Sequence, residues 1–175
     1  MHDREQRLAW IESLMASRAG ALERRSLAVI PVVAARGAAD GKEQEAPDDA
    51  VGAAAFVGVP FEHVLEVAAG SAVTSIALLP PTYCGVIAHG SELCPIIDLR
   101  SNSSQPELVL VIRDRDAIYG LLFCGTPHVL DADAGGPAAH VPLPWPLVVA
   151  KSIEGPRGPV ALLDVQATTD ALLAG

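Results

Sequence analysis

Three cysteines and two histidines are the residues whose types and spacing come closest to a reactive or metal-binding site. Cys84, His89 and Cys94 have the spacing C-x4-H-x4-C, and Cys124 and His128 have the spacing C-x3-H. Thiolates and imidazoles are common zinc ligands, but these spacings differ from those of the usual structural zinc sites. Cys124 and His128 could also serve as nucleophile and base, yet no signature of a known cysteine enzyme accompanies them. Small buried cysteines in strands are the simpler interpretation, so we expect neither metal nor cofactor.

The other residues that could do chemistry are isolated. His63, His89 and His140 are expected at the surface, because a lone histidine rarely forms a site without partners. Glu62 and Glu66 are four residues apart and would share a face only in a helix, whereas Glu66 is expected to lie in a strand. Paired-carboxylate catalysis therefore has little support. The chain contains neither of the common glycine-rich phosphate loops. A non-enzymatic protein is therefore expected, and a small cysteine- or zinc-dependent enzyme is the alternative.

Composition and charge indicate a compact protein and argue against binding to nucleic acid. Half of the 175 residues are apolar but only 4% are aromatic, so small aliphatic side chains must fill the core, as in strand-rich layers. The net charge of −9 provides no basic surface for phosphates, which argues against nucleic acid and against an anionic membrane. An odd number of cysteines, a charged N-terminus and short apolar runs predict a cytoplasmic protein that does not insert into a membrane.

The first 50 residues divide into three predicted parts. Residues 3–25 carry apolar side chains near helical spacing and are expected to form a helix. That helix either packs on its own domain or binds a partner. The apolar run at 27–34 is interrupted by Pro31, which predicts an edge strand. Residues 35–50 are rich in Ala, Gly, Pro and charge and are expected to form a mobile loop.

From residue 53 onward, short apolar segments alternate with turn signals, which is typical of a small barrel or sandwich. An irregular crossing is expected at 131–146, and a terminal helix at 166–173 with Leu172 and Leu173 pointing inward. The predicted strands are 54–59, 64–68, 84–89, 93–98, 107–113, 118–123, 147–153 and 159–164.

The most informative stretch is a predicted hairpin around the turn Gly90–Ser91. Pro95 lacks an N–H group, so its side of the strand must lie at an edge or a bulge. Asp98 and Arg100 share one face of an extended chain, where they either pair or bond nearby backbone. The stretch 85–100, with the phrase P-I-x-D-L-R, resembles the hairpin of the CheW domain, a family of bacterial chemotaxis coupling proteins.

Fragments at 58–67, 119–130 and 160–165 resemble further phrases of that family in the right order. The resemblance implies a mainly β fold of two interleaved five-stranded SH3-like barrels, with an N-terminal helix and a short C-terminal helix. It divides the chain into a helical extension at 1–26 and a CheW-like domain at 27–175. It also implies a scaffold that joins the cytoplasmic tip of a methyl-accepting chemoreceptor to the regulatory domain of a CheA-type histidine kinase in a chemosensory array.

The resemblance assigns the receptor to a groove between the two barrels. Val64, Glu66, Val86 and Ile87 correspond to that groove region. Gly90 falls where the family has a turn arginine that contacts a partner. The loss of this charge predicts weak binding to a standard receptor hairpin.

Overall fold

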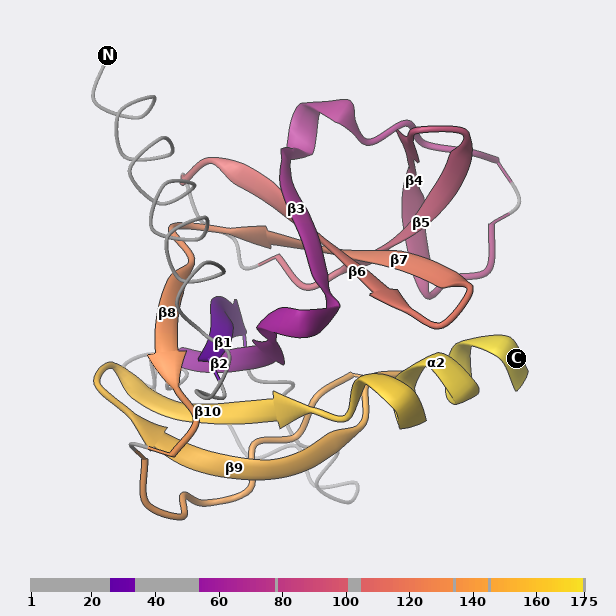
Figure 1. Ribbon diagram of the computed structural model, residues 1–175. Coiled ribbons are helices and arrows are strands. Elements are labelled where there is room, and N and C mark those ends of the chain that lie inside the picture. The colour runs from indigo at the N-terminus through magenta and orange to yellow at the C-terminus, as the bar shows by residue number, and fades with distance from the viewer. Residues whose placement is uncertain are drawn as a thin grey trace, which may run out of the picture.

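The computed structural model describes residues 26–33, 54–77, 79–100, 105–133, 135–144 and 146–174. The helix predicted at 3–25 and the loop predicted at 35–50 lie outside these residues. The described chain forms two five-stranded sheets and a C-terminal helix, and Figure 1 shows the sheets one above the other. The mainly β prediction is confirmed, as are the predicted strands and terminal helix from residue 54 onward. None of the described helices is long and apolar enough to cross a membrane.

Sheet A, the lower sheet in Figure 1, has the strand order β8-β1-β2-β10-β9. Most neighbours are antiparallel, but β10 runs parallel to β2. The Val and Ile residues of these segments favour strands because β-branched side chains pack well on a pleated surface. The strands are β1 (Ser26–Val33), β2 (Ala54–Pro60), β8 (His128–Asp131), β9 (Val149–Gly155) and β10 (Gly158–Leu163).

Sheet B has the strand order β3-β6-β7-β5-β4. It is inserted in the chain between β2 and β8 of sheet A, and the short 3-10 helix η1 (Phe61–His63) makes the first crossing. A second 3-10 helix, η2 (Gly70–Ala72), follows β3. The strands are β3 (Val64–Ala69), β4 (Tyr83–His89), β5 (Glu92–Asp98), β6 (Glu107–Asp114) and β7 (Ala117–Cys124).

The central strands of both sheets carry buried side chains on both faces. The largest cluster lies between them and combines β1, β2 and β10 of sheet A with β5, β6 and β7 of sheet B. A second cluster around Val29 and Phe56 lies on the other face of sheet A, and a third around Ile96 and Val109 lies on the other face of sheet B. Burial on both faces explains the continuous apolar run at 108–112, which shows no alternation.

The end strands of each sheet are joined by the chain that follows one of them. Thr74, beyond β3, bridges to Val86 of β4 through two backbone hydrogen bonds with N···O distances of 2.8 and 2.9 Å. Pro137, beyond β8, bridges to Ile153 of β9. Strands β3 and β4 are the two end strands of sheet B, and β8 and β9 are the two end strands of sheet A. Barrels need such closure, and the assignment of two SH3-like barrels stays a prediction.

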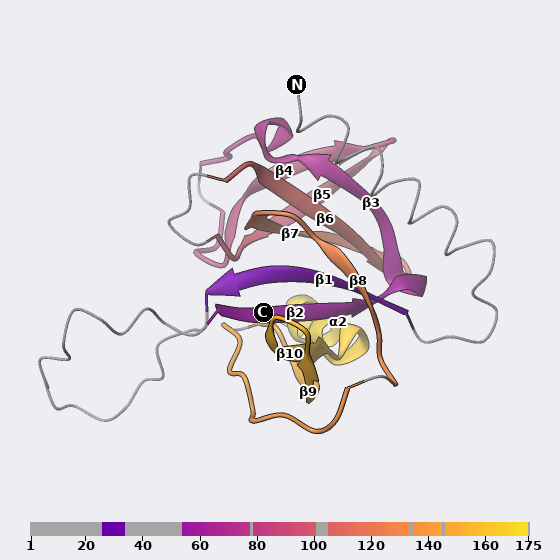
Figure 2. The same ribbon diagram turned by 90° about the vertical axis from the view of Figure 1, so that its left-hand side faces the viewer.

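Figure 2 shows the two sheets from a second side. Polar contacts join the β6–β7 turn to η1 and to the C-terminal helix. His63 Nδ1 of η1 lies 3.1 Å from the carbonyl oxygen of Arg113. Arg115 Nη2 donates to Asp170 Oδ1 of helix α2 (Val165–Ala174), at 3.1 Å. Arg115 has a φ of 54°, which is unusual for a residue other than glycine. Helix α2, which follows sheet A, is thereby attached to sheet B.

Three details of the predicted pattern are wrong. The segment 27–34 is not an edge strand, because β1 pairs with both β2 and β8, although β8 stops short of Pro31. No strand is predicted at 128–131, where β8 forms, because four residues are too few to show an alternation. Leu172 packs on the central cluster as expected, but Leu173 is 72% exposed.

Candidate functional site

The β4–β5 hairpin is the predicted feature that positions the candidate site, and its geometry confirms the sequence analysis. Gly90 has a φ of 61°, the left-handed value that a two-residue hairpin turn requires of glycine. Pro95 pairs with β4, whereas the ladder between β5 and β7 begins at Ile96. The missing N–H group of Pro95 therefore falls outside the β7 ladder, as its chemistry requires.

The two faces of this hairpin have opposite environments. Ile87 and Cys94 lie opposite each other on the inner face and are 3% and 0% exposed. Successive side chains of a strand alternate between faces, so the neighbouring residues point outward. The outer face carries four apolar residues, here called the apolar strip: Val86, Ala88, Leu93 and Pro95.

The apolar strip continues into the core between the sheets. Leu93, Pro95 and Ile97 alternate along β5 and so share a face. Leu93 is 67% exposed, Pro95 is half-buried, and Ile97 is 2% exposed within the central cluster. The strip is therefore the uncovered end of a face whose other end packs against sheet A.

Charged side chains next to the hairpin turn are paired with one another. Glu66 Oε1 of β3 lies 3.0 Å from His89 Nδ1 of β4, although β3 and β4 are the two end strands of sheet B. Arg113 of β6 donates a hydrogen bond to Glu92 of β5 and thereby lowers the pKa of the Glu92 carboxyl. Because His89 and Glu92 alternate with the residues of the strip, these contacts lie on the inner side of the hairpin end, and the strip lies on the opposite face.

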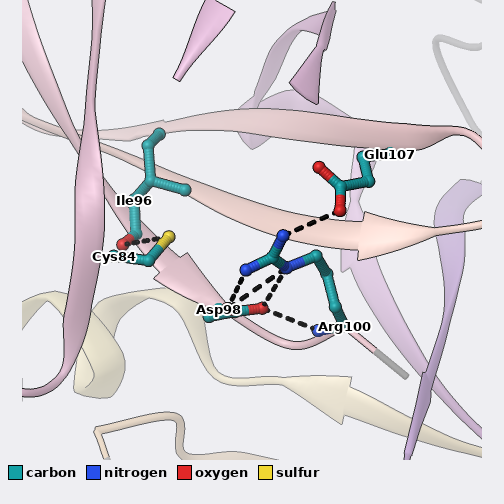
Figure 3. A network of polar contacts seen from close by, with 5 residues as sticks. All are labelled: Cys84, Ile96, Asp98, Arg100 and Glu107. Atoms are coloured by element: carbon teal, nitrogen blue, oxygen red, sulfur yellow. Dashed lines mark hydrogen bonds and ion pairs between the residues drawn. The ribbon is translucent and has the colours of Figure 1, made fainter. Parts of the chain in front are cut away.

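A second network lies at the far end of β5, where Asp98 and Arg100 pair as one of the two predicted arrangements (Figure 3). Arg100 Nε and Nη2 donate to the Asp98 carboxylate at 2.9 and 2.7 Å, and the Arg100 backbone N–H donates at 3.0 Å. Arg100 Nη1 donates to Glu107 at 2.7 Å. Burial alone would raise the pKa of Asp98, but the hydrogen bonds from Arg100 lower it. The network fixes the chain where β5 ends against the start of β6.

The structure separates the five residues that the resemblance assigns to a partner. Val64 and Ile87 are 5% and 3% exposed, so their side chains support the surface from inside. Glu66 and Gly90 are exposed near the hairpin turn, and Val86 is half-buried in the apolar strip. A direct contact with a partner stays a prediction for these last three residues.

The environments of the three cysteines oppose thiolate chemistry: Cys94 and Cys124 are buried and Cys84 is half-buried. Burial raises the pKa of all three thiols, that of Cys94 to about 12. A reactive cysteine needs the opposite shift. His128 packs edge-on against Phe56, with ring centroids 5.8 Å apart, and is not hydrogen-bonded to Cys124. Within the described ranges, no group of three or more His, Cys, Asp or Glu side chains is arranged to hold a metal ion.

Leu93 and Arg113 are the surface residues that the sequence analysis missed. Leu93 belongs to the apolar stretch 93–97, in which both faces of the strand carry apolar residues. Alternation therefore gives no signal that one face becomes uncovered toward the turn. The sequence offers no sign that Arg113 reaches Glu92, because this contact crosses the sheet.

The fold resembles that of a solved scaffolding protein. The crystal structure of the scaffolding protein TtCheW from Thermoanaerobacter tengcongensis matches with a TM-score of 0.53 and 16% sequence identity, covering 81% of this chain and 90% of that chain. No protein-family model matches the sequence. No curated protein matches it either. At this identity the likeness establishes a CheW-like fold.

Proposed function

We propose that this chain is a non-enzymatic scaffold that couples chemoreceptors to a CheA-type histidine kinase in the bacterial cytoplasm. The fold likeness to a CheW scaffolding protein over 81% of the chain carries the proposal. The intact P-I-x-D-L-R phrase at 95–100 and the pairing of Asp98 with Arg100 support it. The chemistry is that of an interface, in which apolar area is buried and polar groups form the rim.

The apolar strip is the surface best suited to the helical hairpin of a receptor tip. Leu93 supplies an exposed apolar side chain for the contact. On the inner face of the hairpin, Ile87 and Cys94 pack in the third hydrophobic cluster and support the two strands. The side chains of Glu66 and Glu92 are 46% and 42% exposed at the turn end of the hairpin. Glu92 alternates to the face opposite Leu93, so these charges flank the strip at its turn end. A contact centred on four apolar residues suits weak, reversible binding, and an array strengthens such binding because many weak contacts act together. We assign the kinase's regulatory domain to exposed ends of the two predicted barrels.

The turn departs from the family in a way that affects partner choice. Gly90 replaces an arginine, and its φ of 61° would strain any L side chain placed there. Ser91, the next residue, does not have a positive φ and is exposed. Ser91→Arg is therefore the substitution that restores a charge without straining the turn.

Calorimetric titration against a receptor-tip fragment and against a kinase regulatory domain tests this function. We expect weak receptor binding by the wild type and roughly tenfold tighter binding by Ser91→Arg, since a charge-assisted contact is worth ~1–3 kcal/mol. Leu93→Asp should weaken it by a similar factor. Gln166→Arg and Leu173→Asp, on exposed positions of α2, are the matched controls. Failure of both partners to bind the wild type would refute the proposal.

A further inference from the structure

Strand β8 carries a histidine without a polar partner. His128 is the first residue of β8 and lies opposite Val29 of β1. Both of its ring nitrogens are buried, and neither has a hydrogen-bond partner. The ring meets Phe56 of β2 edge-on, at 5.8 Å and an interplanar angle of 84°. This environment suits a neutral imidazole, because a buried charge needs a partner.

The charge that acts on this ring has the wrong sign to stabilise an imidazolium. Arg157, in the turn between β9 and β10, is the charged side chain that influences His128. β1 and β2 present Val29 and Phe56 to it, and no carboxylate of the described residues pairs with it. Burial and then Arg157 lower the pKa of His128 below its ordinary value. Protonation would place a second cation near Arg157 in an apolar setting.

Strand β8 is also held in its sheet by a short ladder of four residue pairs. It is an end strand of sheet A, and among the described strands its ladder partner is β1, over Ser26–Val29. We propose that β8 is a pH-sensitive edge of sheet A, and that protonation of His128 releases β8 from β1. Release would uncover the edge of β1 and part of the cluster that contains Leu27 and Phe56. The opposite flank of β1 keeps its longer ladder to β2 and so holds the rest of the sheet.

Amide hydrogen exchange measured by NMR on the full chain tests this inference. Protection factors, corrected for intrinsic exchange, are compared at about pH 7.5 and about pH 5.5, on either side of the ordinary histidine pKa. We expect protection to fall by up to roughly tenfold for amides bonded between β1 and β8, while amides bonded between β1 and β2 keep theirs. Equal loss in both ladders, or no loss, would overturn the inference.

Two variants separate the ring from general acid effects. His128→Phe keeps an aromatic ring beside Phe56 but cannot be protonated, so the loss of protection should disappear. His140→Phe, at an exposed position, should leave the loss unchanged. Arg157→Gln removes the repelling cation and should move the midpoint of the loss to higher pH. A loss that persists in His128→Phe, or an imidazolium signal with the β1–β8 ladder still protected, would show that the ring simply turns outward.

Discussion

Leu93 and Ile97 lie on the same face of β5, four residues apart, but only one of them is covered. Ile97 is 2% exposed because sheet A packs over its end of the strand, whereas Leu93 is 67% exposed near the turn. Both side chains are large and apolar, so residue type does not account for the difference. The difference in exposure follows from the position of sheet A, which covers Ile97 but not Leu93. A strand can therefore serve as core and as candidate interface along one continuous face.

Ile97→Asp should have the largest effect on folding. The carboxylate would enter the cluster between the sheets without a partner, at a cost of several kcal/mol, on the order of the total stability of a domain. We expect a protein that is unfolded or close to it at room temperature. Circular dichroism and thermal melting measure this directly.

Leu93→Asp is the matched control on the same face of the same strand. An exposed substitution should change the free energy of unfolding by no more than about 0.5 kcal/mol. If the two variants melt alike, the two ends of this face do not differ in burial, and the apolar strip is misplaced.

The hairpin could be predicted from the sequence because the required signals are local. The turn at Gly90, the position of Pro95 and the pairing of Asp98 with Arg100 each depend on residues within a few positions of one another. Turn type, the missing proline N–H group and the alternation of side chains fix these features without reference to the rest of the chain.

Features that depend on contacts across the fold were not predictable in this way. The pair Glu66–His89 joins the end strands β3 and β4, so it exists only because sheet B brings its two edges together. The burial of Val64 and Ile87, both expected in a groove, likewise depends on which elements cover them. A resemblance between sequences aligned these positions, but it carried no information on which face each side chain occupies.

Gly85→Ala tests the closure that lies directly behind the apolar strip. A Cβ atom at Gly85 would lie 2.6 Å from the carbonyl oxygen of Thr74 and 2.7 Å from Cγ1 of Val73. Backbone at this position cannot yield without disturbing the bridge between Thr74 and Val86. We expect a loss of about 1–3 kcal/mol in unfolding free energy, as for other overpacked sites. Denaturant titration measures it.

Hydrogen exchange shows whether that loss is local. The amides of Thr74 and Val86 should lose protection first, while amides between β6 and β7 keep it. Gly136→Ala is the control, because a Cβ atom there would meet open space. An equally large loss in the control would mean that the bridge does not explain the effect.

Arg100→Lys should give the smallest change in the free energy of unfolding, because Arg100 lies just beyond the covered end of β5 and its side chain is partly exposed. Lysine keeps the charge but cannot reproduce the planar two-point contact with Asp98. Both side chains are 37% exposed, so screening by solvent limits the loss to about 0.5–1 kcal/mol. Arg157→Lys is the control, because no described residue forms an ion pair with Arg157. Each of the two substitutions keeps the positive charge.

The pH dependence of the Arg100→Lys effect distinguishes the ion pair from packing. The pKa of Asp98 is lower in the folded chain than its ordinary value of 3.8, because hydrogen bonds from Arg100 outweigh burial. Its contribution is therefore complete above that ordinary value and is lost as the pH falls through the folded pKa. The difference in unfolding free energy between wild type and Arg100→Lys should shrink below about pH 4. A difference that stays constant down to pH 2 would assign the effect to the packing of the arginine stem instead of its charge.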